Sequence, residues 1–587
     1  MQYYRYLRFY MALYGRYFWI GIGFLVLTNI LDVLPPLIIM RGVDQITNKA
    51  PLNELGKTAA LFAIITFALA IVRFHWRMQF GKFHQNLAKD LRERVFKKLT
   101  ELGPTFYSKN PIGELMSLVT NDVETIRMGM GPGLLVLTDA FLYFLTIPPI
   151  MMALSIPLTF KTLALLPILP FFIHWLGNVI HRRFLEVQER FSELSGITQE
   201  GITGIRIIKS YVQEENQVKV FNTASCKWQD HSQTVAWAES FMHPVMEFCV
   251  SVGVVVLLYL GSKDVLGGVL TIGGFVAFQR YIIKMVWPMT AVGWGFSLIS
   301  QARASLERID EFLNTAPDVQ LHAHKLNNSM PTVKIDQVVE PQLNGLIEIK
   351  NLNFSYPYST RLALKDISLN IYPGDTLGIV GPVGSGKTTI AQLLCHLYAV
   401  ERGKIFINSI DINDISLQTL RRHISLVPQD TFLFSASITE NMSFGMEATA
   451  SVDHLTRVAQ IAKLEDEIEA LPQRYDTMLG ERGVNLSGGQ KQRMTITRAL
   501  LRKSPVIIFD DSLSAVDAET ETLILRRLKE ETQKHTTIII SHRLSTLSLC
   551  NRIMVLKDGA IEGFGTPEEL RTTSSTYREL LQLQGYT

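Results

Sequence analysis

The chain has 587 residues, 47% of them hydrophobic, and a formal net charge of +3. That length exceeds a single hydrophobic core, so two or three domains are expected. The charge is too small and too evenly spread to indicate a nucleic-acid partner. Four widely spaced cysteines without C-x-x-C spacing predict reduced thiols rather than disulfides or a zinc site. They are Cys226, Cys249, Cys395 and Cys550.

Hydropathy divides the chain into two parts. Mean hydropathy is +0.17, and the long apolar runs lie in the first half, whereas the second half has mixed patterning. Arg5, Arg8 and Arg16 are spread among aromatic residues, and the apolar run that follows is long enough to span a bilayer, so we expect no cleavable signal. The sequence therefore predicts a membrane protein with a soluble half.

Six segments are long and apolar enough to cross a bilayer. They are approximately residues 17–40, 58–78, 132–154, 158–180, 243–262 and 270–294. The loops after the first, third and fifth spans are short or weakly charged, whereas the N-terminus and the segments after the second and fourth spans are rich in Lys and Arg. The positive-inside rule therefore predicts that both termini are cytoplasmic.

Long cytoplasmic segments connect the second span to the third and the fourth to the fifth. Each has roughly 50 to 60 residues with helical apolar spacing, so the helices should extend well beyond the bilayer. Turn signals mark the tips, at Asn110-Pro111 in the first segment and at Gly204 to Tyr211 in the second. Composition alone predicts only that each segment is a helical hairpin whose charged side chains keep it soluble.

Three acidic residues lie within the predicted spans, although a charge exposed to lipid costs on the order of 3 kcal/mol. Asp32 is expected near the middle of the membrane, with Asp139 and Glu247 closer to the cytoplasm. They are candidates to line a cavity. Equally, they could lie at the inner headgroup level or pair with basic residues of the spans, namely Arg73, Arg77, Arg280 or Lys284.

A linker separates the two halves. Apolar density falls after residue 304, and Pro317, Pro331 and Pro341 punctuate polar sequence. We assign residues 1–315 to a transmembrane domain, 316–345 to the linker and 346–587 to a soluble domain. In the soluble domain strand-like and helical runs alternate, which is typical of a mostly parallel α/β sheet.

The soluble domain contains Gly381-Pro382-Val383-Gly384-Ser385-Gly386-Lys387-Thr388, which fits the phosphate-loop pattern G-x-x-x-x-G-K-[ST]. A buried strand is expected before it, over 375–380, and a helix after it, over 389–398. In such a loop the backbone N–H groups bind phosphate oxygens, Lys387 reaches the β- and γ-phosphates, and Thr388 offers its hydroxyl to Mg²⁺. The residues expected to bind ATP here are Gly381, Gly384, Ser385, Gly386, Lys387, Thr388 and Thr389.

A second apolar strand, over 505–509, ends in Asp510. This carboxylate is placed to hold Mg²⁺ opposite Thr388, as in a Walker B strand. Without the phosphate loop the same five residues would be an ordinary buried strand, so their assignment depends on the loop.

Between these motifs lies Leu486-Ser487-Gly488-Gly489-Gln490, and with it the chain resembles an ATP-binding cassette (ABC) exporter half-transporter. In that family six membrane spans precede one nucleotide-binding domain, here 346–587. Further matches follow the family's order: the adenine-stacking aromatic at Tyr356, the Q-loop at Gln429, the x-loop at 477–483, the D-loop at Asp517, the switch histidine at His542, and coupling helices at the two cytoplasmic tips. The resemblance covers nearly the whole chain.

The resemblance implies a fold and a dimer. The fold is an all-α six-helix transmembrane domain with long cytoplasmic extensions, followed by an α/β P-loop nucleotide-binding domain. Two such domains dimerise head to tail, so Ser487, Gly488, Gly489 and Gln490 would contact the ATP of a partner subunit. The expected Mg²⁺ ligands are Thr388, Gln429 and Asp510. The residues expected to act in hydrolysis are Asp511, His542 and Gln429.

Asp511 departs from the family pattern, which has Glu after the Walker B aspartate to polarise the attacking water. Asp is one methylene shorter, and a displacement of about 1 Å at such a group can cost on the order of 10²-fold in rate. The ATP site on this chain is therefore expected to be degenerate and slow, although its signature is intact. This combination resembles the multidrug-resistance-like A-type subunit of heterodimeric bacterial exporters, which implies a non-identical partner subunit.

We therefore expect an exporter subunit in a bacterial cytoplasmic (inner) membrane. It would use ATP to move hydrophobic or amphipathic compounds, drug-like molecules or lipids, out of the cytoplasm or inner leaflet by alternating access, with membrane lipids and a second subunit as partners. An ATP-gated regulator or channel on the same scaffold is the alternative, and an impaired carboxylate would suit it too. The six spans exclude a soluble ATPase acting on nucleic acid.

Overall fold

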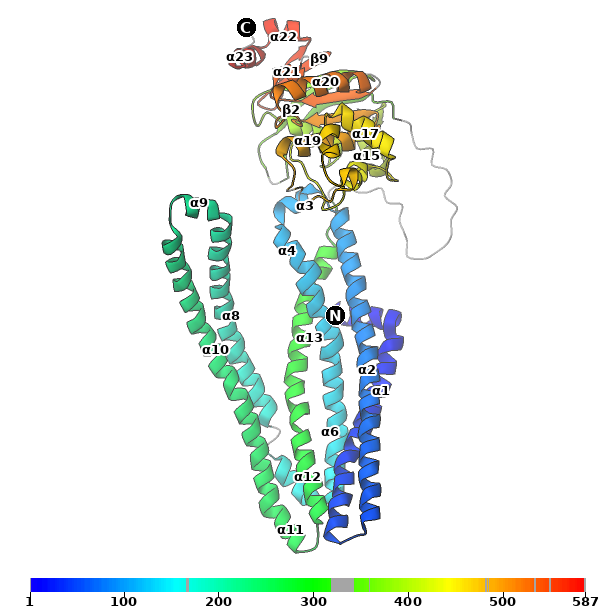
Figure 1. Cartoon of the computed structure of the whole chain (residues 1–587), viewed down its shortest axis with the longest axis vertical. Coiled ribbons are helices and arrows are strands. Elements are labelled where there is room, and N and C mark those ends of the chain that lie inside the picture. The colour runs from blue at the N-terminus through cyan, green and yellow to red at the C-terminus, as the bar shows by residue number, and fades with distance from the viewer. Residues whose placement is uncertain are drawn as a thin grey trace, which may run out of the picture. The chain divides into compact units, whose positions relative to one another are not determined.

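The computed structural model describes residues 2–164, 168–317, 343–357, 359–480, 483, 485–532, 535–547 and 550–584. The chain forms two compact units, drawn together in Figure 1. One unit comprises Met1–Thr100 and Ile112–Thr315, and the other comprises Glu101–Pro111 and Ala316–Thr587. Of the predicted linker, residues 318–342 lie outside the described residues.

The first unit is helical, as predicted. Its helices are α1 (Gln2–Thr47), α2 (Leu52–Glu101), α4 (Ile112–Ser117), α5 (Val123–Met128), α6 (Leu134–Leu154), α7 (Ile156–Leu163), α8 (Ile168–Thr203), α9 (Ile205–Ser210), α10 (Glu214–Val256), α11 (Ser262–Leu266), α12 (Ile272–Lys284) and α13 (Val286–Leu313). Three π-helical turns join neighbouring helices into longer runs, at Leu118–Asp122, Gly129–Gly133 and Leu257–Gly261.

Five helical runs among the described residues are long and apolar enough to cross a membrane. They are Tyr3–Thr47, Leu52–Glu101, Ile112–Leu154, Glu214–Leu266 and Ile272–Leu313. They contain or overlap five of the six predicted spans. The remaining predicted span, 158–180, includes residues 165–167, which lie outside the described residues, with α7 and α8 on either side.

The helices extend beyond the bilayer, as their apolar spacing predicts. At about 1.5 Å per residue, α2 is roughly 75 Å long, more than twice the thickness of a hydrocarbon core. The short helices α3 (Pro104–Lys109) and α9 form at the two predicted cytoplasmic tips. In Figure 1, α8 and α10 run side by side as a hairpin that ends in α9.

An ion-paired cluster ties four helices of the first unit together. The Asp32 carboxylate of α1 accepts hydrogen bonds from Arg73 of α2, Tyr143 of α6 and Lys284 of α12, each at 2.8 Å. A buried carboxylate is stable only with such partners. For Asp32 the pairing alternative is therefore confirmed. Asp139 and Glu247 have no ion pair within the described part of the chain.

The second unit contains two sheets. The smaller has the order β2-β1-β4-β5 and the larger β10-β9-β3-β8-β7-β6. The strands are β1 (Ile347–Phe354), β2 (Leu364–Ile371), β3 (Thr376–Val380), β4 (Ile405–Ile407), β5 (Ile410–Asp411), β6 (Ile424–Val427), β7 (Val506–Asp510), β8 (Thr536–Ile540), β9 (Arg552–Lys557) and β10 (Ala560–Gly565). The strands from β9 to β6 pair in parallel, and β10 is antiparallel.

Helices cover these sheets, so β7 and β8 are buried along their whole length. The helices are α14 (Lys387–Leu394), α15 (Leu417–His423), α16 (Ile438–Met442), α17 (Val452–Ile461), α18 (Glu465–Glu469), α19 (Gly488–Leu501), α20 (Ala518–Thr532), α21 (Leu544–Leu547), α22 (Pro567–Thr573) and α23 (Ser575–Leu583). The carboxyl ends of β3, β6, β7 and β8 lie at one edge of the larger sheet, because these strands are parallel.

The helix predicted over 389–398 differs from the observed α14, which begins two residues earlier and ends at Leu394. His396 has a φ of 48°, which is left-handed backbone and cannot continue a helix. The four cysteines are free thiols, as predicted.

The close approach of α1 and α12 makes a first prediction. A Cβ atom at Gly273 would lie 2.1 Å from the Met40 carbonyl oxygen and 2.6 Å from Asp44 Oδ1. Gly273→Ala should therefore cost about 1–3 kcal/mol of stability through overpacking, measured as a lower unfolding temperature in detergent. Gly23→Ala is the control, since that Cβ would meet nothing within 4 Å. Equal effects of the two substitutions would contradict the α1–α12 contact.

Candidate nucleotide-binding site

The loop between β3 and α14 has a backbone that requires glycine. Gly386 has a φ of 99°, and a Cβ atom there would lie 2.7 Å from the Ala363 carbonyl oxygen. At Gly381 an added Cβ would lie 2.0 Å from the carbonyl oxygen of Leu556 in β9. Because no larger side chain fits, the loop curls tightly over the start of α14, as a phosphate cradle must.

Lys387 lies inside this cradle. Its Nζ donates to the carbonyl oxygens of Gly381 and Pro382, at 2.9 and 2.8 Å, and the side chain is buried. Burial lowers the pKa of Lys387, while the nearby carboxylates of Asp511 and Asp510 raise it. The lysine is therefore held against the loop, at the place where a phosphate charge would be bound.

Thr388 and Asp510 come together across the sheet, as predicted. The Thr388 hydroxyl donates to Asp510 Oδ1 at 3.1 Å, and Asp510 is only 4% exposed at the end of β7. Burial raises the pKa of Asp510, the charge of Asp511 raises it further, and the Thr388 hydrogen bond opposes both effects. A hydroxyl and a buried carboxylate are ligands that Mg²⁺ prefers, so this pair fits the ion.

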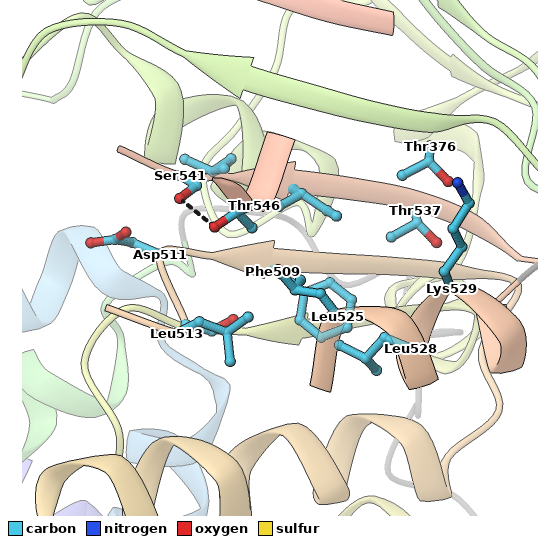
Figure 2. Close-up of a pocket in the computed structure, with 13 residues that line it drawn as sticks. Thr376, Phe509, Asp511, Leu513, Leu525, Leu528, Lys529, Thr537, Ser541 and Thr546 are labelled. Atoms are coloured by element: carbon cyan, nitrogen blue, oxygen red, sulfur yellow. Dashed lines mark hydrogen bonds between the residues drawn. The ribbon is translucent and has the colours of Figure 1, made fainter. Parts of the chain in front are cut away.

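Asp511 has an unusual backbone. Its φ is 46°, a left-handed conformation uncommon for residues other than glycine, and its N–H donates to the Ile540 carbonyl oxygen of β8 at 2.8 Å. Figure 2 shows Asp511 and Lys529 at opposite ends of a pocket lined by apolar side chains, among them Phe509 and Leu525. The Asp511 carboxylate points away from these apolar groups. The hydrogen bond to β8 therefore holds the backbone of Asp511 in this conformation.

His542 follows β8 and lies within the electrostatic reach of the loop. Burial is the main cause that lowers its pKa, the positive charge of Lys387 lowers it further, and Asp511 opposes both. The lowered pKa of His542 favours the neutral imidazole. Lys387 and His542 are 155 positions apart in the sequence. The fold brings them, with Asp510 and Asp511 between them, to one edge of the sheet.

Three residues that sequence reasoning missed support the segment after His542 and its link to the D-loop. Arg543 donates to the Ser514 and Val516 carbonyl oxygens, at 2.7 and 3.0 Å, and pairs with Glu521, whose side chain is 2% exposed. Gln584, just after α23, donates to the His542 carbonyl oxygen at 2.5 Å and accepts from the Leu544 N–H at 2.9 Å. Adjacency to His542 was the only available signal for Arg543, and no sequence motif pointed to Glu521 or Gln584.

Tyr356 is bonded to α14, and Gln429 follows β6. The Tyr356 hydroxyl bonds Thr389 Oγ1 at 2.8 Å and Gln392 Oε1 at 3.0 Å, so α14 positions the ring. Gln429 is exposed two residues beyond β6, whose Val427 pairs with Phe509 of β7. Gln429 therefore lies at the same sheet edge as Asp510.

The signature residues form a helix start apart from the phosphate loop. Ser487 and Gln490 make a capping box at α19, in which Gln490 Oε1 accepts from the Ser487 N–H at 2.7 Å. Helix α19 packs in a different hydrophobic core from α14. Gly488 and Gly489 occupy the first turn of α19. The four signature residues are therefore not part of the site around Lys387.

The D-loop precedes α20 and is hydrogen-bonded to the signature helix α19. Asp517 Oδ1 accepts from the Thr520 N–H at 2.9 Å, and Gln492 of α19 bonds both Ser514 Oγ and the Ala515 N–H. Of the predicted x-loop, 477–483, residues 481 and 482 lie outside the described residues.

The position of Lys387 makes a second prediction. Lys387→Ala should weaken binding of a nucleoside triphosphate at this site at least about tenfold, because a buried charge contact with the phosphates is lost. The measurement is equilibrium binding to the purified chain. Lys365→Ala, an exposed lysine of β2, is the control and should leave affinity unchanged. Unchanged affinity in Lys387→Ala would remove this lysine from its assigned place.

Comparisons with known proteins agree with this geometry. Residues 18–289 match the model of the ABC transporter transmembrane region, and residues 364–514 match the ABC transporter model. The chain is 35% identical over 578 residues to the probable multidrug resistance ABC transporter ATP-binding/permease protein YheI of Bacillus subtilis, covering 98% of this chain and 96% of YheI. It is 33% identical over 568 residues to the multidrug resistance-like ATP-binding protein MdlA of Escherichia coli, covering 96% and 93%.

A solved structure shares the fold. The structure of a bacterial Atm1-family ABC exporter with ATP bound superposes with a TM-score of 0.78 at 24% identity, and covers 97% of this chain and 99% of that one. Together with the relatives, this confirms the predicted helical transmembrane domain followed by an α/β nucleotide-binding domain. The chain belongs to the ABC transporter family, as a fused half-transporter that binds ATP and couples its hydrolysis to export across a membrane.

Proposed function

We propose that the chain exports hydrophobic or amphipathic compounds, such as drug-like molecules or lipids, by alternating access in a bacterial inner membrane. The proposal rests on one observation: a single chain combines a phosphate loop, in which Thr388 is bonded to Asp510, with a helical unit whose helices are long and apolar enough to cross a membrane. The multidrug names of its bacterial relatives support the cargo class. The asymmetry of Lys and Arg in the loops supports cytoplasmic termini.

The residues around the phosphate loop would bind ATP and position the attacking water. Backbone N–H groups of the loop and Lys387 would hold the phosphates, Tyr356 would stack on adenine, and Thr388, Asp510 and Gln429 would hold Mg²⁺. When bound, Mg²⁺ would neutralise charge on the β- and γ-phosphate oxygens. Asp511 would orient the water, and neutral His542 would bond the γ-phosphate.

The signature of this chain would serve a second, non-identical subunit. Ser487, Gly488, Gly489 and Gln490 would contact the partner's ATP, with Asp517 close by. The need for a different partner follows from Asp511: a dimer of identical chains would combine two good signatures with two short carboxylates. A backbone shift could restore the missing reach, but the Ile540 hydrogen bond and the left-handed φ of Asp511 oppose it.

A gated regulator or channel is the second candidate, because the short Asp511 carboxylate would also suit a protein that binds ATP without rapid turnover. The two candidates differ in coupling. An exporter hydrolyses more ATP when cargo is present, whereas a gate needs only ATP binding. ATP hydrolysis by the reconstituted transporter, measured with and without an amphipathic compound, separates them: stimulation supports export and its absence supports the gate.

Asp511 makes a third prediction. The chain purified alone, as a dimer of defined mass, should hydrolyse ATP slowly, and Asp511→Glu should raise the rate at least about tenfold by restoring the missing methylene. Asp511→Asn is the control and should change the low rate little. Brisk, cargo-stimulated hydrolysis by the unaltered chain that Asp511→Asn abolishes would contradict the non-identical partner and favour a homodimer.

A further inference from the structure

Two carboxylates of the membrane unit, Asp32 of α1 and Asp139 of α6, are held in different ways. Asp32 accepts from two cations and a tyrosine, as described above. Asp139 instead accepts from two neutral donors, Asn29 Nδ2 at 2.9 Å and Trp287 Nε1 at 3.1 Å. On α1, Asn29 lies three residues from Asp32; on α6, Asp139 lies four residues from Tyr143; and on the α12–α13 run, Trp287 lies three residues from Lys284. The Asp32 cluster and the Asp139 group are therefore two neighbouring layers supplied by the same helical runs.

Taken together, the two layers carry two positive and two negative charges, but the charges are unequal within each layer. Arg73 and Lys284 share Asp32, which leaves one positive charge in excess there, and Asp139 carries the compensating negative charge without an ion pair in the described part of the chain. Coulomb energy falls with distance, so a cation in contact with Asp139 is attracted more strongly than the more distant excess charge of the Asp32 cluster repels it. Contact with Asp139 therefore remains favourable for a positively charged group.

The second layer is open on one side. Trp287 is 47% exposed and Asp139 is half-buried, whereas Asn29 is 2% exposed. A carboxylate without a cation is too costly to face lipid tails, so its open side must face a polar cavity or a partner group. The indole face offers an attractive surface for a cation, and Asn29 Oδ1 is buried without a hydrogen-bond partner among the described residues. Both features suit a protonated amine, which brings a positive charge and N–H donors.

We propose that Asp139, Asn29 and Trp287 form a binding site for the protonated amine group of an amphipathic cargo. The Asp139 carboxylate contacts the ammonium group, the Asn29 amide oxygen accepts one of its N–H groups, and the Trp287 ring covers its apolar part. Asp32 is excluded from this role because Arg73 and Lys284 already occupy its oxygens. The inference rests on the proposed export of amphipathic compounds and names the chemical group that the membrane unit recognises.

The test uses two probes of nearly equal shape, 1-naphthylmethylamine, which is a cation at pH 7, and the uncharged 1-naphthylmethanol. Binding is measured by equilibrium dialysis with the full-length chain in phosphatidylcholine nanodiscs, after subtraction of empty nanodiscs. The unaltered chain should bind the amine at least about tenfold more tightly than the alcohol. Asp139→Asn should remove this preference, and Asp139→Glu should keep most of it.

Glu215→Gln is the control. Glu215 is an exposed carboxylate in the first turn of α10, outside the predicted spans, so its loss should leave the preference intact. ATP binding by each variant verifies folding. A preference that survives Asp139→Asn, or is absent from the unaltered chain, overturns the proposed site. If uncharged cargo still stimulates ATP hydrolysis in that case, the exporter assignment stands and only the amine site falls.

Discussion

The phosphate charge of ATP must be bound by fixed donors that water cannot replace, and the edge of one parallel sheet meets this requirement. Strand β3 delivers the glycine loop, β7 delivers Asp510 and Asp511, and β8 leads to His542. Because the three strands are adjacent and parallel, their ends meet without long-range adjustment.

Local motifs made much of this site predictable. The phosphate loop, the strand ending in Asp510 and the signature are each contiguous, and the chemistry that they serve fixes their spacing. Contacts between distant residues outside these motifs were not predictable. The link from Gln584 to the His542 loop spans 42 positions, and the pair of Arg543 with the buried Glu521 depends on how α20 packs. The left-handed backbone of Asp511 likewise depends on β8.

In the membrane unit, too, local sequence patterns were predictable and long-range contacts were not. Apolar length predicted spans, and five of them have matching helices among the described residues. Sequence alone left open whether the acidic residues pair or line a cavity. The structure answers differently for each: Asp32 is ion-paired with residues 41 and 252 positions away, whereas Asp139 is held by neutral donors. A carboxylate that is paired with cations holds helices together, whereas one held only by neutral donors can still attract a cation.

We propose that the ATP site of this chain holds nucleotide without rapid turnover, while the ATP site of the partner subunit carries out hydrolysis. Orthovanadate traps ADP only at a site that has completed hydrolysis, so photolabelling with 8-azido-ATP after trapping reports which subunit turned over. In the transporter assembled from both subunits, the account predicts trapped label on the partner and little on this chain. Equal labelling of the two subunits, or label mainly on this chain, would contradict it.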